Sequence, residues 1–252
     1  GVLREHGRAD GPPGQVDGPC VLAGRERRAR GVQRVLCRHG HSVAEGGRDL
    51  RGACRRGYGS RMQGAPVPWT AVVLAGGRGA RMGGVDKPRI EVDGRTLLAR
   101  VVAGIPMDVP IVVVGPTPGD GIDREVGVVR EEPMFGGPVA ALAAALPGVS
   151  TPIVGLVGGD MPAAGTLLAR LAKEWDGEPA LVPVDASGRR QPLCSVLATD
   201  GLRAALDALG DPADRSLRDL LLLVDVRERP LDAEESALLV DIDVPEDLDR
   251  IR

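Results

Sequence analysis

The sequence predicts an α/β protein in which a mostly parallel sheet is covered by helices on both faces. From Trp69 onward, short β-branched runs bounded by Gly and Pro alternate with Ala- and Leu-rich stretches at helical spacing. The strand-like runs are apolar at almost every position, which is typical of strands buried on both faces. With 252 residues, of which 43% are hydrophobic, the chain can bury one substantial core.

The elements follow in order along the chain. The expected strands cover residues 70–75, 110–114, 126–130, 153–157 and 180–184, and the expected helices cover residues 96–102, 139–146, 166–175 and 202–209. Residues 192–198 and 221–226 predict two further strands at a sheet edge, with Ser216 capping a short helix between them. Residues 245–251 open with Pro and acidic residues, which suits the first turn of a terminal helix.

The first 61 residues differ in composition from the rest. They hold 13 Arg, no Lys and 6 acidic residues, a net charge of +7, so the remaining residues carry −10 of the total of −3. No period of 3.6 or 2 is sustained in this stretch, so it lacks the apolar face that a packed element needs. We expect residues 1–61 to be a disordered Arg- and Gly-rich head and residues 62–252 to form the folded domain.

Three interpretations of the head remain open. The first is a disordered tail, or translated sequence upstream of a true start at Met62, and it is favoured by the absence of any core-forming pattern. The second is an Arg-rich nucleic-acid arm, although Tyr58 is the single aromatic residue available for stacking on bases. The third is a zinc site, but its ligands lack the close pairs that such sites use; they would be Cys20, Cys37, His39, His41 and Cys54.

The sequence shows no membrane-spanning run and no secretory signal pattern. We therefore expect a cytoplasmic protein with neither membrane nor nucleic-acid partners, since a folded part with a charge of −10 repels phosphate backbones. Cys194 is the only cysteine after residue 61, and its apolar neighbours predict a buried structural thiol.

A glycine-rich loop follows the first expected strand. Residues 76–88 read GGRGARMGGVDKP, with five glycines in nine positions and the cations Arg78, Arg81 and Lys87. Glycines let backbone N–H groups approach an anionic ligand closely, so the loop predicts a polyphosphate cradle. A dinucleotide-binding G-x-G-x-x-G fails at Met82, and a Walker loop fails at Val85.

This stretch resembles the signature L-A-G-G-x-G/S-x-R-M-G-G-x-D-K of the molybdenum cofactor guanylyltransferases, within the wider nucleotidyltransferase family. The resemblance implies a Rossmann-like nucleotidyltransferase fold. It also implies nucleotide binding by the loop, at Leu74, Ala75, Gly76, Gly77, Gly79, Arg81 and Lys87.

Four later elements extend the resemblance. Residues 158–162, GGDMP, resemble G-x-D-x-P, whose Asp, here Asp160, holds Mg²⁺. Residues 136–140 resemble G-P-L-A-G, which places Gly137 and Pro138 at a helix N-terminus beside the nucleotide. Gln191 and Pro192 match the Q-P element of the acceptor side.

The fourth element departs from the family pattern. Residues 241–248 resemble the terminal N-T-P-E-D, but Asp243 stands where Asn is usual and Val244 where Thr is usual. Asp243 is therefore a second candidate metal ligand beside Asp160.

The chemistry of these residues suits nucleotidyl transfer. An attacking phosphate is already anionic, so no general base is needed, and the chain has no His after His41. We assign catalytic roles to Arg81, facing the departing β- and γ-phosphates, to Lys87, facing the α-phosphate, and to Asp160, holding Mg²⁺. Asp86 is expected to fix the loop or the ribose.

The resemblance implies GTP as donor and molybdopterin carrying molybdenum as acceptor, with pyrophosphate as the second product. Relatives that use CTP read L-A-A-G, whereas Gly76 here leaves room for a purine. Transient contact with enzymes that receive the finished cofactor is also implied. The alternatives are a sister enzyme that uses CTP or another small phosphate, a non-catalytic nucleotide-binding protein, and a nucleic-acid-binding protein.

Overall fold

The computed structural model of the protein describes residues 66–77, 86–116, 121–242 and Asp247. The head at residues 1–61 lies outside this part of the chain, so the predicted domain boundary near Met62 and the three interpretations of the head stay predictions. Gly79 and Arg81 in the glycine-rich loop, Asp243, and the expected terminal helix apart from Asp247 also lie outside it.

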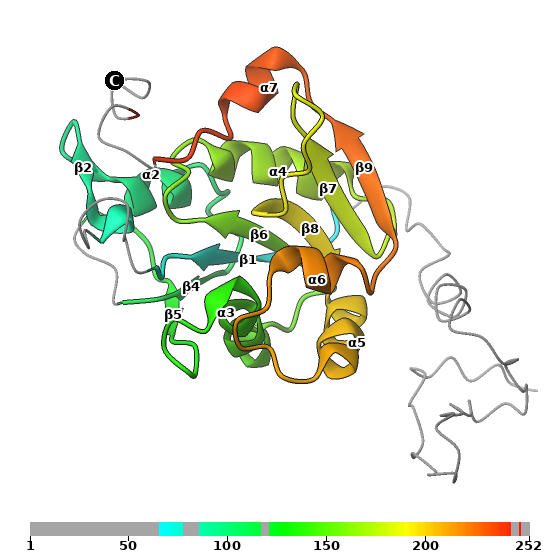
Figure 1. The fold of residues 1–252 in the computed structure, drawn as a ribbon. Coiled ribbons are helices and arrows are strands. Elements are labelled where there is room, and N and C mark those ends of the chain that lie inside the picture. The colour runs from blue at the N-terminus through cyan, green and yellow to red at the C-terminus, as the bar shows by residue number, and fades with distance from the viewer. Residues whose placement is uncertain (1–65, 78–85, 117–120, 243–246, 248–252) are drawn as a thin grey trace, which may run out of the picture. The chain divides into compact units, whose positions relative to one another are not determined.

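Seven strands form one sheet in the order β5-β4-β1-β6-β8-β7-β9 (Figure 1). Their bounds are β1 (Trp69–Leu74), β4 (Ile111–Val114), β5 (Gly127–Val129), β6 (Ile153–Gly158), β7 (Ala180–Val184), β8 (Cys194–Ala198) and β9 (Val226–Pro230). β8 is antiparallel to both of its neighbours, β6 and β7, and every other pairing is parallel. The predicted mostly parallel sheet is confirmed.

Helices cover both faces of this sheet. The α-helices are α2 (Leu97–Ala103), α3 (Gly137–Ala145), α4 (Ala164–Glu174), α5 (Thr199–Leu209), α6 (Leu217–Leu221) and α7 (Ala233–Ala237), with 3-10 turns η3 (Lys87–Arg89) and η4 (Leu146–Gly148). α2 and α4 cover one face, and α3, α5 and α6 cover the other (Figure 1). Within the residues described, no helix is both long and apolar enough to cross a membrane.

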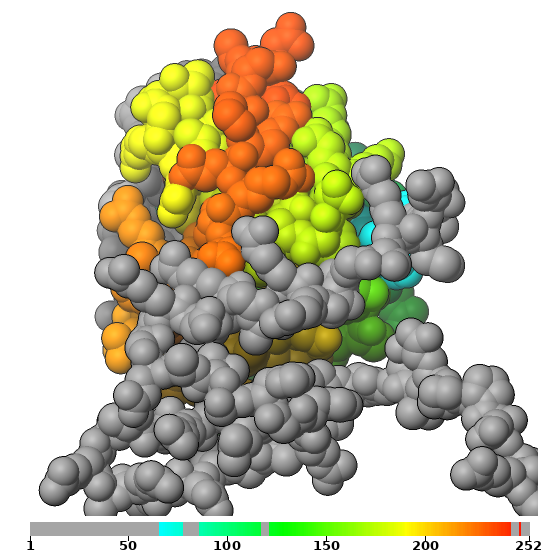
Figure 2. Space-filling view, turned by 90° about the vertical axis from the view of Figure 1, so that its right-hand side faces the viewer, coloured from blue at the N-terminus to red at the C-terminus, as the bar shows by residue number. Residues whose placement is uncertain are grey.

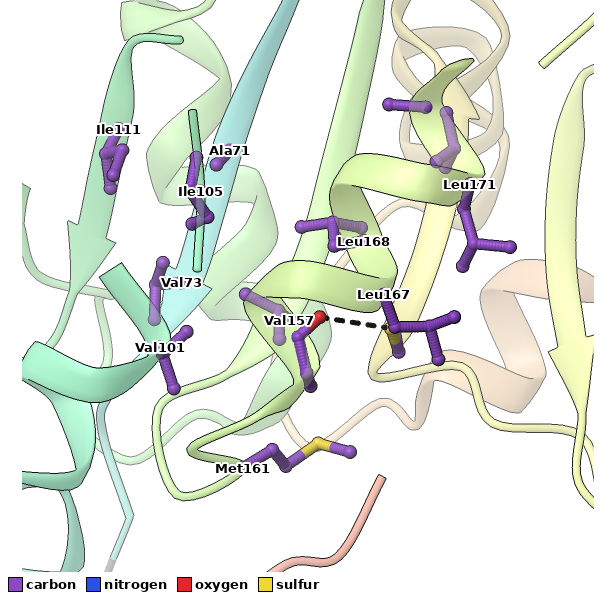
Figure 3. Close-up of a cluster of buried hydrophobic side chains, with 14 of the residues drawn as sticks. Ala71, Val73, Val101, Ile105, Ile111, Val157, Met161, Leu167, Leu168 and Leu171 are labelled. Atoms are coloured by element: carbon purple, nitrogen blue, oxygen red, sulfur yellow. Dashed lines mark hydrogen bonds between the residues drawn. The ribbon is translucent and has the colours of Figure 1, made fainter. Parts of the chain in front are cut away.

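The alternation of side chains along each strand divides the core into two layers. Ala71 and Val73 of β1 pack with Val157 and with Leu168 and Leu171 of α4 (Figure 3). Val72, which lies between Ala71 and Val73, faces the opposite layer, under α3 and α5. This is the geometry of a strand buried on both faces, and it explains why β1 reads as a continuous apolar run.

Two strand predictions need correction. Residues 192–198 were expected at a sheet edge, but β8 lies in the interior between β6 and β7, and all five of its residues are buried. Residues 221–226 were expected to form a strand, but the apolar run ends α6 and the edge strand β9 begins only at Val226. A short apolar run is compatible with either a helix or a strand, and periodicity cannot separate them.

The remaining elements agree with the sequence or were missed by it. Ser216 caps α6 as predicted, in a reciprocal capping box with Asp219. The hairpin of β2 (Glu91–Val92) and β3 (Arg95–Thr96) and the short helix α7 were not predicted. The hairpin matters for the site, because it follows the turn that carries Lys87.

The order of the strands places the functional loops at one edge. The chain passes from β1 to β4 and β5 on one side, and then crosses to β6 on the other side of β1. Ligands of open parallel sheets bind beyond the carboxyl ends of the strands at such a switch point. The loops that follow β1 and β6 both begin there.

Candidate functional site

The two loops predicted to carry the chemistry begin side by side at the ends of β1 and β6. Leu74 at the end of β1 pairs with Gly158 at the end of β6. The Gly159 N–H donates a hydrogen bond to the Leu74 carbonyl at 2.9 Å. A Cβ atom on Gly159 would lie 3.1 Å from the Ala75 Cα, so glycine at this position lets the loops approach each other closely.

Asp160 lies in the loop directly after β6 and is partly exposed. A Cβ atom on Gly158 would lie 2.9 Å from Asp160 Oδ1, so Gly158 leaves room for the carboxylate to turn back toward the strand end. The described residues contain no group of three His, Cys, Asp or Glu side chains able to hold a metal. A site with one or two carboxylates suits Mg²⁺, which completes its shell with phosphate oxygens and water.

Lys87 is the first residue of the turn η3. A small hydrophobic cluster links the segment after this turn to Asp160. Val92, Leu97 and Ile242 form this cluster beside the turn, and Ile242 is fully buried. The Ile242 N–H donates to the Asp160 carbonyl at 3.1 Å. Ile242 therefore connects the loop after β6 with the Lys87 segment, and Asp243, the next residue in the sequence, lies outside the described residues.

The ends of β1 and β4 carry glycines and therefore have little side-chain bulk. Gly115 follows β4 with φ of +148°, and a Cβ atom there would lie 2.8 Å from the Ala75 carbonyl carbon. Gly76 and Gly77 are exposed after β1. Gly115 lets the chain after β4 approach Ala75 closely, and at Gly76 and Gly77 the backbone itself forms a surface against which a flat ligand can lie.

A buried carboxylate lies beside Gly76. Glu131, two residues after β5, is 7% exposed, and its Oε1 accepts a hydrogen bond from the Phe135 N–H at 3.1 Å. A Cβ atom on Gly76 would lie 3.4 Å from the same Oε1. A side chain at position 76 would thus face Glu131, a residue that was not predicted from the sequence. Glu131 follows the strand expected at residues 126–130, just as Asp160 follows the strand expected at residues 153–157, so its place after a strand could have marked it.

The predicted helix N-terminus also lies at this edge. α3 begins at Gly137, which has φ of +89°, and Pro138 occupies its first turn. The Asp214 N–H donates to the Gly136 carbonyl at 2.7 Å, so the loop before α6 braces the start of α3. The connection from β5 to α3 contains Glu131, and this brings the helix start and the buried carboxylate into one segment.

The predicted acceptor-side residues reach the same edge because β8 is antiparallel. A strand that runs against its neighbours begins where they end, so Gln191 and Pro192 lie just before β8 on the Asp160 side. The Gly158 N–H donates to the Leu193 carbonyl at 3.2 Å, which joins this segment to the end of β6, just before Asp160. The Gln191 Nε2 donates to Asp185 Oδ2 at 2.6 Å.

Cys194 is fully buried beneath these loops, as the sequence predicts. Burial raises the pKa of its thiol to about 12, so the group stays protonated at neutral pH. Its Sγ lies 3.9 Å from the Ala164 carbonyl, and Met161 packs in the same cluster (Figure 3). The thiol is part of the core and does not face the site.

Comparisons with known proteins identify the family of the chain. Residues 71–229 match the family described as MobA-like NTP transferase domain. The chain is 33% identical over 154 residues to a molybdenum cofactor guanylyltransferase of Cupriavidus taiwanensis, covering 56% of this chain and 77% of that protein. It is 30% identical over 195 residues to a probable molybdenum cofactor guanylyltransferase of Natronomonas pharaonis, covering 73% and 96%.

Solved structures share the fold. A nucleotidyl transferase from Methanothermobacter thermautotroptrophicus superimposes with a TM-score of 0.58 at 26% identity, over 73% of this chain and 96% of that one. Molybdopterin-guanine dinucleotide biosynthesis protein A from Archaeoglobus fulgidus gives a TM-score of 0.55 at 21% identity, over 72% and 95%. The chain belongs to the MobA-like NTP transferase family and is a nucleotidyltransferase.

Proposed function

We propose that the protein transfers GMP from GTP to molybdopterin carrying molybdenum, forming the guanine dinucleotide cofactor and releasing pyrophosphate. One observation carries the proposal. Gly76 at the start of the glycine-rich loop, the Glu131 carboxylate, Asp160 and Gln191 come from distant parts of the sequence and lie at one edge of the sheet. The relatives named as molybdenum cofactor guanylyltransferases support the choice of acceptor.

The nucleotide lies on the β1-β4-β5 side in this proposal. The guanine base rests against Gly76, and its N1–H and amino group donate to the Glu131 side chain, whose oxygens accept hydrogen bonds. Adenine presents an acceptor at N1, which the carboxylate repels, and uracil has one donor instead of two on its pairing edge. The carboxylate therefore supports GTP as donor, together with the space that Gly76 leaves.

The phosphates lie along the glycine-rich loop. We assign Lys87 to the α-phosphate, Arg81 to the departing β- and γ-phosphates, and Gly77 and Gly79 to the binding of the phosphate oxygens. Gly137 and Pro138 place the start of α3 at the outer side of the nucleotide. These groups act by positioning the triphosphate and by stabilising the charge that develops on it.

Asp160 and Asp243 are the residues that would hold Mg²⁺. The ion supplies Lewis-acid stabilisation of the phosphoryl oxygens when it is bound. The acceptor phosphate attacks the α-phosphorus, the bond to the bridging oxygen breaks, and pyrophosphate departs with the electron pair. The attacking oxygen is already ionised, so the chain supplies no general base.

A direct assay tests this function. The full chain is incubated with Mg²⁺, one of the four nucleoside triphosphates and molybdopterin loaded with molybdate, and pyrophosphate release is followed. We expect release with GTP and molybdopterin together, with little release when either is missing. Faster release with CTP and a sugar or alcohol phosphate would show that the protein is a sister enzyme with another acceptor.

A further inference from the structure

The loop between β7 and β8 contains a carboxylate with an unusually complete set of partners. Asp185 Oδ1 accepts hydrogen bonds from the Ser187 N–H at 2.8 Å, the Ser187 hydroxyl at 2.6 Å and the Arg189 N–H at 3.0 Å. These bonds close a tight turn over residues 185–189. The second oxygen, Oδ2, takes no part in the turn and accepts from the Gln191 Nε2 at 2.6 Å.

The rest of Gln191 is fixed by its backbone. Its N–H donates to the Pro183 carbonyl at 2.9 Å, and its carbonyl accepts from the Cys194 N–H at 3.1 Å. The side-chain carboxamide is therefore the only part of Gln191 whose orientation the backbone leaves open, and Asp185 sets it.

The charge of Asp185 decides which way the carboxamide turns. The hydrogen bond from the Ser187 hydroxyl, followed by the other donors, lowers the pKa of Asp185 to about 2, so the group is ionised at neutral pH. An ionised carboxylate has no hydrogen to donate. A flipped carboxamide would set its oxygen against this carboxylate, so Gln191 keeps Nε2 toward Asp185 and Oε1 directed away from it.

We propose that Asp185 is a positioning residue that orients the Gln191 carboxamide so that Oε1 is offered to the acceptor substrate. The group of the acceptor that meets Gln191 is then a hydrogen-bond donor, an N–H or O–H, such as the amino or ring N–H groups of a pterin. This inference rests on the proposed function, because Gln191 lies at the acceptor side of the site. It adds a second requirement for the acceptor, which must carry a hydrogen-bond donor for Gln191 as well as a phosphate.

The turn is also braced from outside, independently of Asp185. The Ala186 N–H donates to Ser236 Oγ of α7 at 3.0 Å, and Arg190 Nε forms an ion pair with Glu228 of β9 at 2.5 Å. The loop between β7 and β8, α7 and β9 lie side by side on the face shown in Figure 2. A substitution that keeps the hydrogen-bonding shape of Asp185 therefore leaves the loop in place.

Polarity reversal tests the proposal. Asp185→Asn keeps an oxygen for the Ser187 and Arg189 donors but turns an NH₂ toward Gln191, which must then flip and present its own NH₂ to the acceptor. Gln191→Glu alone sets two carboxylates against each other. In Asp185→Asn/Gln191→Glu, the new amide at position 185 donates to the new carboxylate at position 191, whose other oxygen again faces the acceptor. The double variant therefore restores the original polarity.

The readout is the kinetics of pyrophosphate release with GTP and molybdenum-loaded molybdopterin. We expect each single variant to lose roughly tenfold or more in kcat/KM for the acceptor, with KM for GTP changed by less than about twofold. The double variant should recover to within about threefold of the wild type. A double variant no more active than Asp185→Asn overturns the proposal.

Ser187→Ala is the matched control. It removes one donor from the turn and keeps the Asp185–Gln191 hydrogen bond, so kcat/KM for the acceptor should stay within about twofold of the wild type. A loss as large as that of Asp185→Asn would show that the turn acts only through its stability and would also overturn the proposal.

A second measurement separates this proposal from the proposed function. In the ¹⁵N-labelled full chain, the Gln191 side-chain N–H signals should be shifted and slow to exchange, and Asp185→Asn should abolish both properties. Signals like those of exposed glutamines would overturn the orientation of Gln191 whatever the acceptor is. An inactive wild type with an intact Gln191 signal would contradict the proposed acceptor and leave the orientation established.

Discussion

The two sides of the site present different chemical groups, mainly backbone on one side and polar side chains on the other. On the β1-β4-β5 side the strands are parallel, and Gly76 and Gly77 expose the backbone after β1, beside one buried carboxylate, Glu131. On the β6-β8-β7 side an antiparallel strand is inserted, and polar side chains in contact, Asp185 and Gln191, take the place of bare backbone.

This difference suggests that one side binds the nucleotide, a function shared by many transferases, and the other recognises a particular acceptor. Backbone N–H groups and glycines hold phosphates and a flat base in a way that many acceptor specificities can share. Side chains that hydrogen-bond one another can be exchanged to suit a particular acceptor. Substitutions on the two sides should therefore affect different kinetic constants.

The largest effects are expected where the two sides meet. Asp160→Asn and Lys87→Ala remove interactions that strengthen in the transition state, and each should lower kcat by about 10²–10³ with little change in the melting temperature. Asp207→Asn on α5 and Lys173→Ala on α4 remove the same charges from exposed positions and serve as controls. Near-wild-type turnover in Asp160→Asn or Lys87→Ala would mean that the site is misassigned.

A smaller effect should separate the nucleotide side from the acceptor side. Glu131→Gln replaces one accepting oxygen with an NH₂ group, so it opposes the donors of guanine. The GTP to CTP ratio of kcat/KM should fall by roughly tenfold, while KM for molybdopterin stays nearly constant. The measurement is a competition between the two triphosphates at one acceptor concentration. If KM for the acceptor rises instead, Glu131 does not read the base.

Gly76→Ala should weaken recognition of guanine by Glu131 indirectly. The new methyl group would lie 3.4 Å from Glu131 Oε1, so the carboxylate need move only slightly, and the GTP to CTP ratio should fall by a few-fold at most. The same competition assay on the Gly76→Ala and Glu131→Gln/Gly76→Ala variants checks this. Equal ratios in the double variant and in Glu131→Gln alone would show that both act through Glu131, whereas fully additive losses would contradict it.

The smallest effect is expected from deletion of the head, residues 1–61. Deletion of residues 1–61 removes a stretch with no core-forming pattern, so kcat/KM and the melting temperature should both equal those of the full chain within error. Side-by-side assays and thermal melts of the two proteins are the measurement. An insoluble or inactive shortened chain would assign the head a structural role.

The sequence predicted the parts of the molecule whose local signals are strong. β1, β6 and α4 have clear apolar patterns, and the loops after β1 and β6 combine glycine with charge at strand ends. The capping box at Ser216 was visible because capping is a local interaction.

What the sequence left unresolved depends on distant contacts. β9 reads VRERP, and its charged residues hid a strand that pairs with only one neighbour, β7. The interior place of β8 is fixed by its partners β6 and β7 and not by its own five residues. Glu131 and Asp185 carry no motif. The role of Glu131 follows from Gly76, which is distant in the sequence, and the role of Asp185 from the fold of its own loop, which brings it to Gln191.

The inserted strand also affects how the chain can fold during synthesis. The half-sheet β5-β4-β1-β6 is complete once Gly158 has emerged from the ribosome, but β6 pairs next with β8, not with β7, which follows it in the chain. Until residues 194–198 emerge, the apolar edge of β6 has no partner strand and β7 has none of its final neighbours in the sheet. Such an unpaired apolar edge is a site for association between nascent chains. The feature that brings Gln191 to the site thus leaves the growing chain exposed for the 35 residues between Gly158 and Cys194.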